Sequence, residues 1–195
     1  MGKIVYIMGK SSTGKDTIFK ELIRKNAFNF KTIVSYTTRP IREGEKDGQE
    51  YFFTDEAGFN KLKDEGKVIE DRCYNTIHGP WRYFTVDDGQ INDRDNYITI
   101  GTLESYVKIC EYYGNNRIIP VLVELDDGVR LQRALNREKK QDKPKYEEMC
   151  RRFLADSADF SEEKIQSAKI KRRFYNNELN VCLQEIEDYI HENME

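Results

Sequence analysis

The sequence predicts an α/β fold with three layers arranged around a parallel sheet. Its opening residues run from an apolar, β-rich segment, 3–8, through a glycine loop into apolar residues at helical spacing, the order that begins a parallel α/β unit. Strand-like and helix-like segments then alternate along the chain. With 195 residues, 38% of them hydrophobic and 34% charged, the chain has the size and apolar content of one domain carrying inserts.

Composition and charge exclude several classes of protein. The longest apolar runs, such as 4–8 and 118–123, have the length of strands and fall short of the roughly 20 residues that a bilayer helix needs. Twelve Tyr, ten Phe and only four Pro argue against disorder. The net charge of −3, from 32 basic and 35 acidic residues, does not suit a general nucleic-acid binder.

The cysteines and the start of the chain predict a cytoplasmic protein. No apolar stretch with a cleavage site begins the sequence, so we expect no secretory signal. Cys73, Cys110, Cys150 and Cys182 form no Cys-x-x-Cys pair for zinc or redox chemistry. Cys110 and Cys182 fall on apolar helix faces and are expected to be small buried side chains. Reduced thiols fit the cytoplasm.

The remaining elements follow from local patterns. Helical spacing of apolar residues over 18–23 predicts the first helix. Further strands are expected at 31–36, 51–53, 68–74, 97–100, 117–124 and 172–175. Further helices are expected to be capped by Thr54 and closed by Gly66, to run from about 102 to Gly114, to be capped by Asp126 or Asp127, to begin near Pro144, and to close the chain over 181–190. Gly79-Pro80 predicts a turn.

Two inserts interrupt the alternation of strands and helices. They cover about 35–84 and 130–160 and leave a core of about 1–34, 85–129 and 161–195. In the second insert, one helix is expected to present a single apolar face, consisting of Tyr146, Met149, Cys150, Phe153 and Leu154.

The loop between the first strand and the first helix fits Gly-x-x-x-x-Gly-Lys. Its residues are Gly9, Lys10, Ser11, Ser12, Thr13, Gly14, Lys15, Asp16 and Thr17. Glycines let backbone N–H groups turn inward around phosphates, the helix contributes the positive end of its dipole, and Lys15 contributes a compact charge. The alternative is a simple glycine turn between strand and helix.

Asp16 stands where such loops usually carry Ser or Thr, whose hydroxyl meets Mg²⁺. A carboxylate is also a hard oxygen ligand, so we expect Asp16 to bind Mg²⁺ directly or through water. Without that ion it would place a negative charge beside the phosphates.

A second motif occupies residues 35–53 and reads S-Y-T-T-R-P-I-R-E-G-E-K-D-G-Q-E-Y-F-F. Arg39 and Arg42 each offer forked donors suited to a phosphate or a carboxylate. The alternative is that both arginines form ion pairs with Glu43 and Glu45.

The two motifs together resemble the guanylate kinase family, and the order of elements resembles it to the end of the chain. That resemblance implies a P-loop NTPase core, a nucleoside-monophosphate-binding insert at 35–84 and a helical lid at 130–160. It also implies transfer of the γ-phosphoryl group of ATP, with Mg²⁺, to GMP. By position, the acceptor phosphate would meet Ser35, Arg39, Arg42 and Tyr51.

The resemblance also places residues around the acceptor base. Glu70 corresponds to the acid that reads the guanine edge, where a carboxylate accepts two donors that adenine lacks. From the residues alone, Glu70 reads as a solvated charge at a strand end. His78 takes the position of a phosphate-binding tyrosine, the alternative being an exposed loop histidine without a role.

Thr99 and Gly101 stand where related enzymes carry aspartates at the end of a strand. We expect Asp16 to supply the missing carboxylate from the other side of the nucleotide site. On that hypothesis, Asp16→Ser abolishes activity unless an Asp is restored at Gly101.

Residues 130–152 contain nine Lys and Arg against four acids. Such a segment is a nucleic-acid site, a solvated face or a lid that faces phosphates. Its one aromatic residue, Tyr146, disfavours nucleic acid, for which stacking platforms are typical. By family position, Arg137 and Arg152 are the transition-state arginines, Arg133 is a further triphosphate contact, and Asn176 touches adenine.

The sequence therefore predicts an ATP- and Mg²⁺-dependent kinase for GMP or dGMP, in which Lys15, Arg137 and Arg152 neutralise the moving phosphoryl group. Its partners would be these nucleotides, without nucleic acid or membrane, and the protein would be a monomer or homodimer. Two alternatives stay open. One is a related kinase for another nucleoside monophosphate or ribose bisphosphate, and the other is a non-catalytic interaction module of the same fold, which Lys15 argues against.

Overall fold

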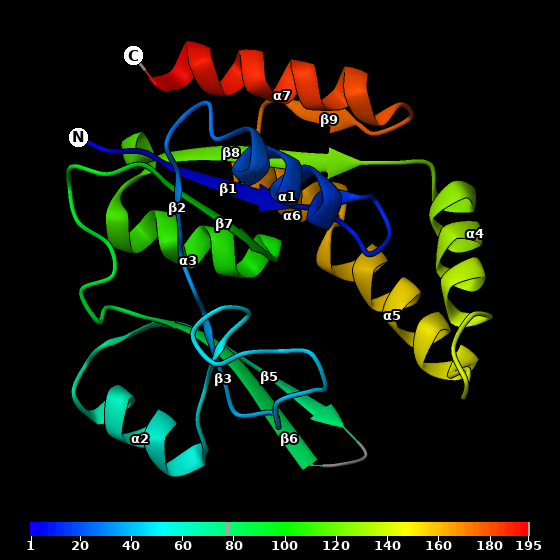
Figure 1. Ribbon diagram of the computed structural model, residues 1–195, viewed down its shortest axis with the longest axis horizontal. Helices are drawn as coiled ribbons and strands as arrows, with labels where there is room; N and C mark the ends of the chain where they lie inside the picture. Colours follow the sequence, from blue (N-terminus) through cyan, green and yellow to red (C-terminus); the bar gives the residue numbers. More distant parts are fainter. Residues whose placement is uncertain (77–78, 195) are drawn as a thin grey trace.

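The computed structural model describes residues 1–76 and 79–194 and contains two separate sheets (Figure 1). The larger sheet has five parallel strands in the order β2-β7-β1-β8-β9. Their bounds are β1 Ile4–Met8, β2 Lys31–Thr32, β7 Tyr97–Gly101, β8 Ile118–Glu124 and β9 Arg173–Tyr175. The predicted α/β class with a parallel sheet is confirmed.

Helices cover both faces of this sheet and make the three layers (Figure 1). They are α1 Lys15–Lys25 and α7 Leu179–Met194 on one face, and α3 Leu103–Tyr113 with α6 Glu162–Ser167 on the other. Val5 and Ile7 of β1 pack with Ile18 of α1, whereas Tyr6 packs with Leu103 of α3. The alternation follows from the two-residue period of a strand, which turns successive side chains to opposite faces.

The smaller sheet lies below the core in the view of Figure 1 and has the order β4-β3-β6-β5. Its elements are β3 Tyr36–Thr37, β4 Phe52–Phe53, α2 Glu56–Asp64, β5 Val68–Thr76 and β6 Gly79–Val86. The pair β3–β4 is parallel and the other pairs are antiparallel. Phe59 of α2 packs with Phe84 and Val86 of β6 and forms a small core for this sheet.

The strand predicted at 31–36 is divided between the two sheets. β2 pairs with β7 in the core, whereas β3 pairs with β6 in the smaller sheet. Between them, the side-chain amide of Gln90 bonds both backbone groups of Val34: its Oε1 accepts from the N–H at 2.8 Å and its Nε2 donates to the C=O at 3.2 Å. A side chain thus replaces the ladder partner that Val34 loses as the chain leaves the core.

Two local predictions are corrected. Asp55, not Thr54, caps α2, because its Oδ1 accepts from Gly58 N at 2.7 Å. Gly79 and Pro80 begin strand β6 and pair with Thr76 and Asn75 of β5, so they are not the predicted turn. Strand β6 and the short helix α6 were not expected. The prediction that Asp126 or Asp127 caps a helix is confirmed for Asp126, Thr102 caps α3, and Cys110 and Cys182 are buried as expected.

Helices α4 Asp127–Glu138 and α5 Tyr146–Asp159 project together beside the core (Figure 1). The apolar face predicted for α5 is not a core face, since no α5 residue is fully buried and Leu154 is 69% exposed. A short 3-10 turn, Asn115–Arg117, precedes β8. Among the helices of the described ranges, none has the length and apolar character needed to cross a membrane.

Candidate functional site

The loop after β1 has a backbone that only glycine fits at two positions. Gly9 has a φ of +154°, and a Cβ there would lie 2.3 Å from the carbonyl oxygen of Val123. Gly14 has a φ of +90°, and a Cβ would lie 2.3 Å from Nδ2 of Asn176. Both contacts are far below normal separations, so the two glycines of the motif are required by neighbouring β8 and by the segment after β9.

The N-terminus of α1 is left without a side-chain cap. The helix begins after Gly14, which has no side chain to accept a hydrogen bond. The hydroxyl of Ser12 is buried and has no hydrogen-bond partner within the described ranges. Thr13 is 1% exposed, and its hydroxyl donates to the Lys10 carbonyl at 3.0 Å, which closes the loop on itself. Uncapped N–H groups at a helix start and an unsatisfied hydroxyl form an arrangement that suits an anion.

Two predicted donor-side residues meet at Gly14. Asn176 is 3% exposed, and its Nδ2 donates to the Thr13 carbonyl at 2.7 Å while its Oδ1 has no partner in the described part of the chain. An Nη of Arg133 would lie 3.8 Å from a Cβ on Gly14. Asn176 is therefore first of all a support for the phosphate loop, and its free Oδ1 is an acceptor beside that loop.

Lys15 and Asp16 lie next to each other at the helix start. Nζ of Lys15 is 3.7 Å from Oδ2 of Asp16, whose side chain is 75% exposed. Among the described residues, no three His, Cys, Asp or Glu side chains are grouped as a metal site. Mg²⁺ usually keeps several waters and takes one or two carboxylates together with substrate phosphates. A single accessible carboxylate beside a phosphate loop fits that requirement, with the nucleotide phosphates as the other ligands.

A cavity of about 1010 Å³ joins the loop to α4 and α5. It is lined by Ser11 and Ser12 from the loop, by Arg42 and Trp81 from the part that contains the smaller sheet, and by side chains of α4 and α5. Arg137 and Arg152, predicted from different parts of the sequence, both line it. Arg42, Arg137 and Arg152 make no ion pair among the described residues, whereas Arg151 pairs with Glu148 at 2.7 Å. The cavity thus collects positive charge from three segments, alongside the carboxylates of Glu138, Glu147 and Glu148 in its lining.

Two arginines in this lining were not singled out from the sequence, Arg130 and Arg151. For Arg130 a signal was present: it precedes Arg137 by seven residues, which is two helical turns, so both lie on one face of α4. Lys15 is not among the residues that line the cavity, and neither are Ser35, Arg39, Tyr51 and Glu70.

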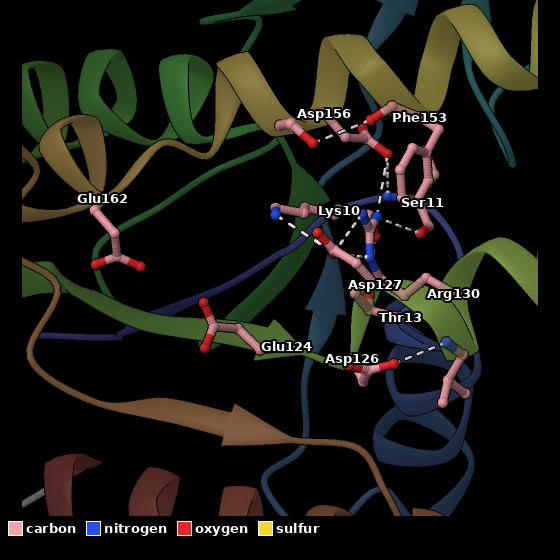
Figure 2. A network of polar contacts seen from close by, with 12 residues as sticks. Lys10, Ser11, Thr13, Glu124, Asp126, Asp127, Arg130, Phe153, Asp156 and Glu162 are labelled. Carbon is pink, nitrogen blue, oxygen red and sulfur yellow. Dashed lines mark hydrogen bonds and ion pairs between the residues drawn. The ribbon is translucent and has the colours of Figure 1, made fainter.

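Lys10 departs from the rest of the loop. Its Nζ lies 3.5 Å from Oδ1 of Asp127, and it lines a second cavity of about 300 Å³ on the Glu124 and Glu162 side (Figure 2). Its side chain is therefore turned away from the larger cavity that Ser11 and Ser12 line.

Arg39 forms the ion pair that the sequence offered as an alternative to phosphate binding. The side chain is 3% exposed, and its two Nη atoms donate to Glu45 at 2.7 and 2.5 Å. Nη1 also donates to the Pro40 carbonyl at 2.9 Å, and the guanidinium lies over the Tyr51 ring at 5.1 Å. These bonds lower the pKa of the Glu45 carboxyl to about 2. Arg42 differs, because it is exposed and its side chain lines the large cavity.

Glu70 is buried, so its interpretation as a solvated strand-end charge is wrong. It is 5% exposed, accepts from the Thr85 hydroxyl at 2.7 Å and from Nε of Arg72 at 3.0 Å, and has Nη2 of Arg72 at 3.4 Å. Arg72 also reaches the hydroxyl of Thr102, the cap of α3, at 3.4 Å. The carboxylate predicted to read guanine already has donors on both oxygens, and the pair joins β5 to the core.

The other predicted acceptor residues lie around β3 and β4. The backbone carbonyl of Ser35 accepts from Phe52 N at 2.9 Å. Tyr51 packs edge-on against Tyr83 with ring centroids 5.6 Å apart, and burial raises the pKa of its hydroxyl. His78 lies outside the described residues.

The sequence is similar to those of known proteins. The family model described as Guanylate kinase matches residues 1–79. Guanylate kinase from Malacoplasma penetrans is 28% identical over 193 residues, which is 97% of this chain and 84% of that protein. Guanylate kinase from Caldanaerobacter subterraneus subsp. tengcongensis is 29% identical over 153 residues, 78% of this chain and 70% of that one.

The fold is likewise similar to a solved structure. The crystal structure of guanylate kinase from Anaplasma phagocytophilum superposes with a TM-score of 0.66 over 99% of this chain and 86% of that one, at 17% sequence identity. A parallel five-stranded sheet with a glycine-lysine loop after its first strand defines the class of phosphate-loop α/β proteins. Within that class, the chain is similar to guanylate kinases over nearly its whole length.

Proposed function

We propose that this protein is a nucleoside monophosphate kinase that transfers the γ-phosphoryl group of ATP to GMP or dGMP. The observation that carries the proposal is the large cavity, in which the phosphate loop and three unpaired arginines from separate segments face one space. Its volume of about 1010 Å³ is at the upper end of the range of roughly 300–1,000 Å³ that is usual for ligand sites.

In this proposal the donor occupies the loop. The amides at the start of α1, Lys15 and the exposed carboxylate of Asp16 would hold the phosphates with Mg²⁺, which neutralises charge on the phosphate oxygens. Arg133 and Asn176, which meet at Gly14, would lie on the nucleoside side of the donor. Arg42 would hold the acceptor phosphate, with Ser35, Arg39 and Tyr51 shaping its surroundings.

Phosphoryl transfer needs positioning and charge neutralisation rather than a covalent intermediate. Arg137 and Arg152 would close over the phosphoryl group as α4 and α5 approach the core, so residues 130–160 act as a lid and 35–84 as the acceptor-binding insert of the single domain. Closure would also exclude water and suppress hydrolysis of ATP.

The hydrogen bonds of Glu70 favour a second class of acceptor as the alternative. Because Arg72 and Thr85 already donate to Glu70, guanine could be read by this carboxylate only if Arg72 moved. An acceptor other than guanine, with hydrogen-bond acceptors facing Arg72, is therefore the alternative substrate.

The test is an acceptor panel with Mg²⁺–ATP in a coupled assay of ADP release, with GMP, dGMP, AMP, CMP, UMP, dTMP and ribose bisphosphate. We expect GMP or dGMP to give the highest kcat/KM. Arg137→Met should lower kcat by roughly 10³-fold, as loss of an arginine on the transition state does. Lys139→Met, an exposed charge two residues on, is the matched control and should change little. A preference for another acceptor would mean that the substrate is not a guanine nucleotide. Binding of Mg²⁺–ATP without turnover of any acceptor would favour a non-catalytic interaction module.

A further inference from the structure

Both backbone groups of Ser11 in the phosphate loop are bonded to side chains of α4 and α5 (Figure 2). The N–H of Ser11 donates to Oδ2 of Asp156 at 2.7 Å. Nη1 of Arg130 donates to the carbonyl oxygen of Ser11 at 2.9 Å. These contacts span 145 and 119 residues of sequence, so they join the phosphate loop to two helices that lie far from it along the chain.

Arg130 is an unusual side chain for this place because it is completely buried. Its exposed fraction is 0%, and its guanidinium lies over the Phe153 ring of α5 at 4.8 Å. Nε donates to Asp127 at 2.9 Å, and Nη1 lies 3.5 Å from Oδ2 of Asp156. A buried arginine with an acid is often no more stabilising than a well-packed apolar pair, so stability alone does not account for it.

The spacing along each helix connects this cluster with the arginines of the large cavity. On α4, Ala134 and Arg137 follow Arg130 by four and seven residues and therefore share its face. On α5, Arg152 precedes Asp156 by four residues and shares that face. Arg137 and Arg152 line the cavity that Ser11 also lines. Anchoring Arg130 and Asp156 at the bases of the helices thus fixes the rotation of each helix about its axis.

We propose that Arg130 and Asp156 are positioning residues that hold the phosphate loop and orient Arg137 and Arg152 toward the donor phosphates. The proposal rests on the proposed kinase function for its consequence in turnover. The physical claim is narrower: the loop and the two helices behave as one unit, because Ser11 is clamped between a donor and an acceptor from the helices. Without the clamp, the loop keeps its fold but loses its fixed geometry.

The decisive variant replaces the buried pair by an apolar pair, Arg130→Met with Asp156→Leu. This removes both bonds to Ser11 without leaving an unpaired buried charge. The matched control is Arg117→Met: Arg117 is 4% exposed and donates to the carbonyls of Gly2 and Asn92 and to Asp93. It too is a buried arginine that holds backbone carbonyls, but it lies at the opposite end of the parallel sheet, where β1 and β8 begin. A second variant, Asp156→Asn, keeps an acceptor for the Ser11 N–H and serves as the conservative rescue.

Four measurements are made on each full-length variant: thermal unfolding, amide hydrogen exchange at Ser11, calorimetric binding of Mg²⁺–ATP, and kcat in the ADP-release assay. We expect the double variant to exchange Ser11 at least about tenfold faster, with β1 amides unchanged. Its affinity for Mg²⁺–ATP and its kcat should fall by between about tenfold and the roughly hundredfold that a misplacement of 1 Å costs. Asp156→Asn should keep most of the affinity, and Arg117→Met should lower the unfolding temperature without changing affinity.

The proposal is overturned if the double variant protects Ser11 as the unaltered protein does, or if it is destabilised yet binds Mg²⁺–ATP with unchanged affinity. It is also overturned if Arg117→Met weakens binding equally, because the effect would then follow stability alone. Failure of the unaltered protein to bind Mg²⁺–ATP would refute the donor site of the proposed function, and the exchange at Ser11 would still decide whether the clamp exists. If the double variant does not fold, Asp156→Asn and Asp156→Ala are compared by the same exchange and binding measurements, and equal results for the two overturn the proposal.

Discussion

The hydroxyl of Tyr6 on β1 occupies the space beside Gly101 on the neighbouring strand β7. An ideal Cβ on Gly101 would lie 1.9 Å from that oxygen and 2.8 Å from the ring carbon that bears it. Tyr6 is 2% exposed, and its hydroxyl is hydrogen-bonded to that of Ser105 on α3 at 2.6 Å. The end of β7 therefore has no room for a side chain at position 101. This explains in physical terms why no acid stands at this position.

Restoring an aspartate there should fail for steric reasons. We expect Gly101→Asp to lower the free energy of unfolding by about 1–3 kcal/mol, the usual cost of overpacking, as measured by urea titration. Gly101→Ala should cost a similar amount, because the clash begins at Cβ. Adding Tyr6→Leu should recover part of the loss by clearing the hydroxyl. Wild-type stability of Gly101→Asp would show that Tyr6 moves aside easily. An aspartate at position 101 could then compensate for the loss of the Asp16 carboxylate.

The pair of Arg39 and Glu45 should make the protein sensitive to acid. Two hydrogen bonds from Arg39 lower the pKa of Glu45 to about 2, below the value of about 4.5 expected in the unfolded chain. Since the folded pKa is the lower one, the pair stabilises the protein fully above about pH 4.5, and this contribution, of order 2 kcal/mol, is lost as the pH falls toward 2. Urea unfolding at pH 6, 4 and 3 should show a smaller loss in Glu45→Gln than in the unaltered protein. Exposed Glu43 supplies the control variant, Glu43→Gln, which should keep the full acid sensitivity. Equal curves for all three proteins would contradict the prediction.

Arg72 should stabilise the fold as well as influence which acceptor binds. Arg72→Ala leaves the buried carboxylate of Glu70 without its ion pair, and removal of one partner from a buried pair costs about 3–5 kcal/mol. Arg24→Ala, which breaks an exposed pair with Glu21, is the comparison and should cost no more than about 1 kcal/mol. Chemical denaturation measures both. A loss as small for Arg72→Ala as for Arg24→Ala would mean that water reaches Glu70 readily.

Asp16 should affect the use of magnesium more than the fold. Because its side chain is 75% exposed, Asp16→Ala should change the unfolding temperature little. We expect it to raise the Mg²⁺ concentration for half-maximal ADP release by about tenfold, equivalent to about 1.4 kcal/mol of binding. Glu21→Ala, which removes an acid paired with Arg24 further along the same helix, is the control for a lost acid. An unchanged magnesium titration would remove Asp16 from the metal site.

The sequence by itself determined the parallel core, the phosphate loop and the resemblance to guanylate kinases. Those features depend on local patterns: apolar runs of strand length, helical spacing at Ile18 and Leu22, and glycines at fixed separation. Each pattern is formed by residues close together in the sequence, so it can be recognised without knowing the tertiary structure. The short strands β3 and β4 and the end of the core strand β2 were harder to separate, since two residues carry too little periodicity.

Only the tertiary structure decided which charges are free. Arg39 and Arg42 look alike in the sequence, yet one is buried against Glu45 and the other faces the cavity. Glu70 also accepts from Thr85 on the neighbouring strand, and Arg130 donates to Ser11 in the phosphate loop, and a side chain finds such partners only after the elements have packed. A buried charge must be paired, whereas an exposed one need not be. The packing of the elements, and not the residue type, therefore determines whether an arginine forms an internal ion pair or faces the cavity.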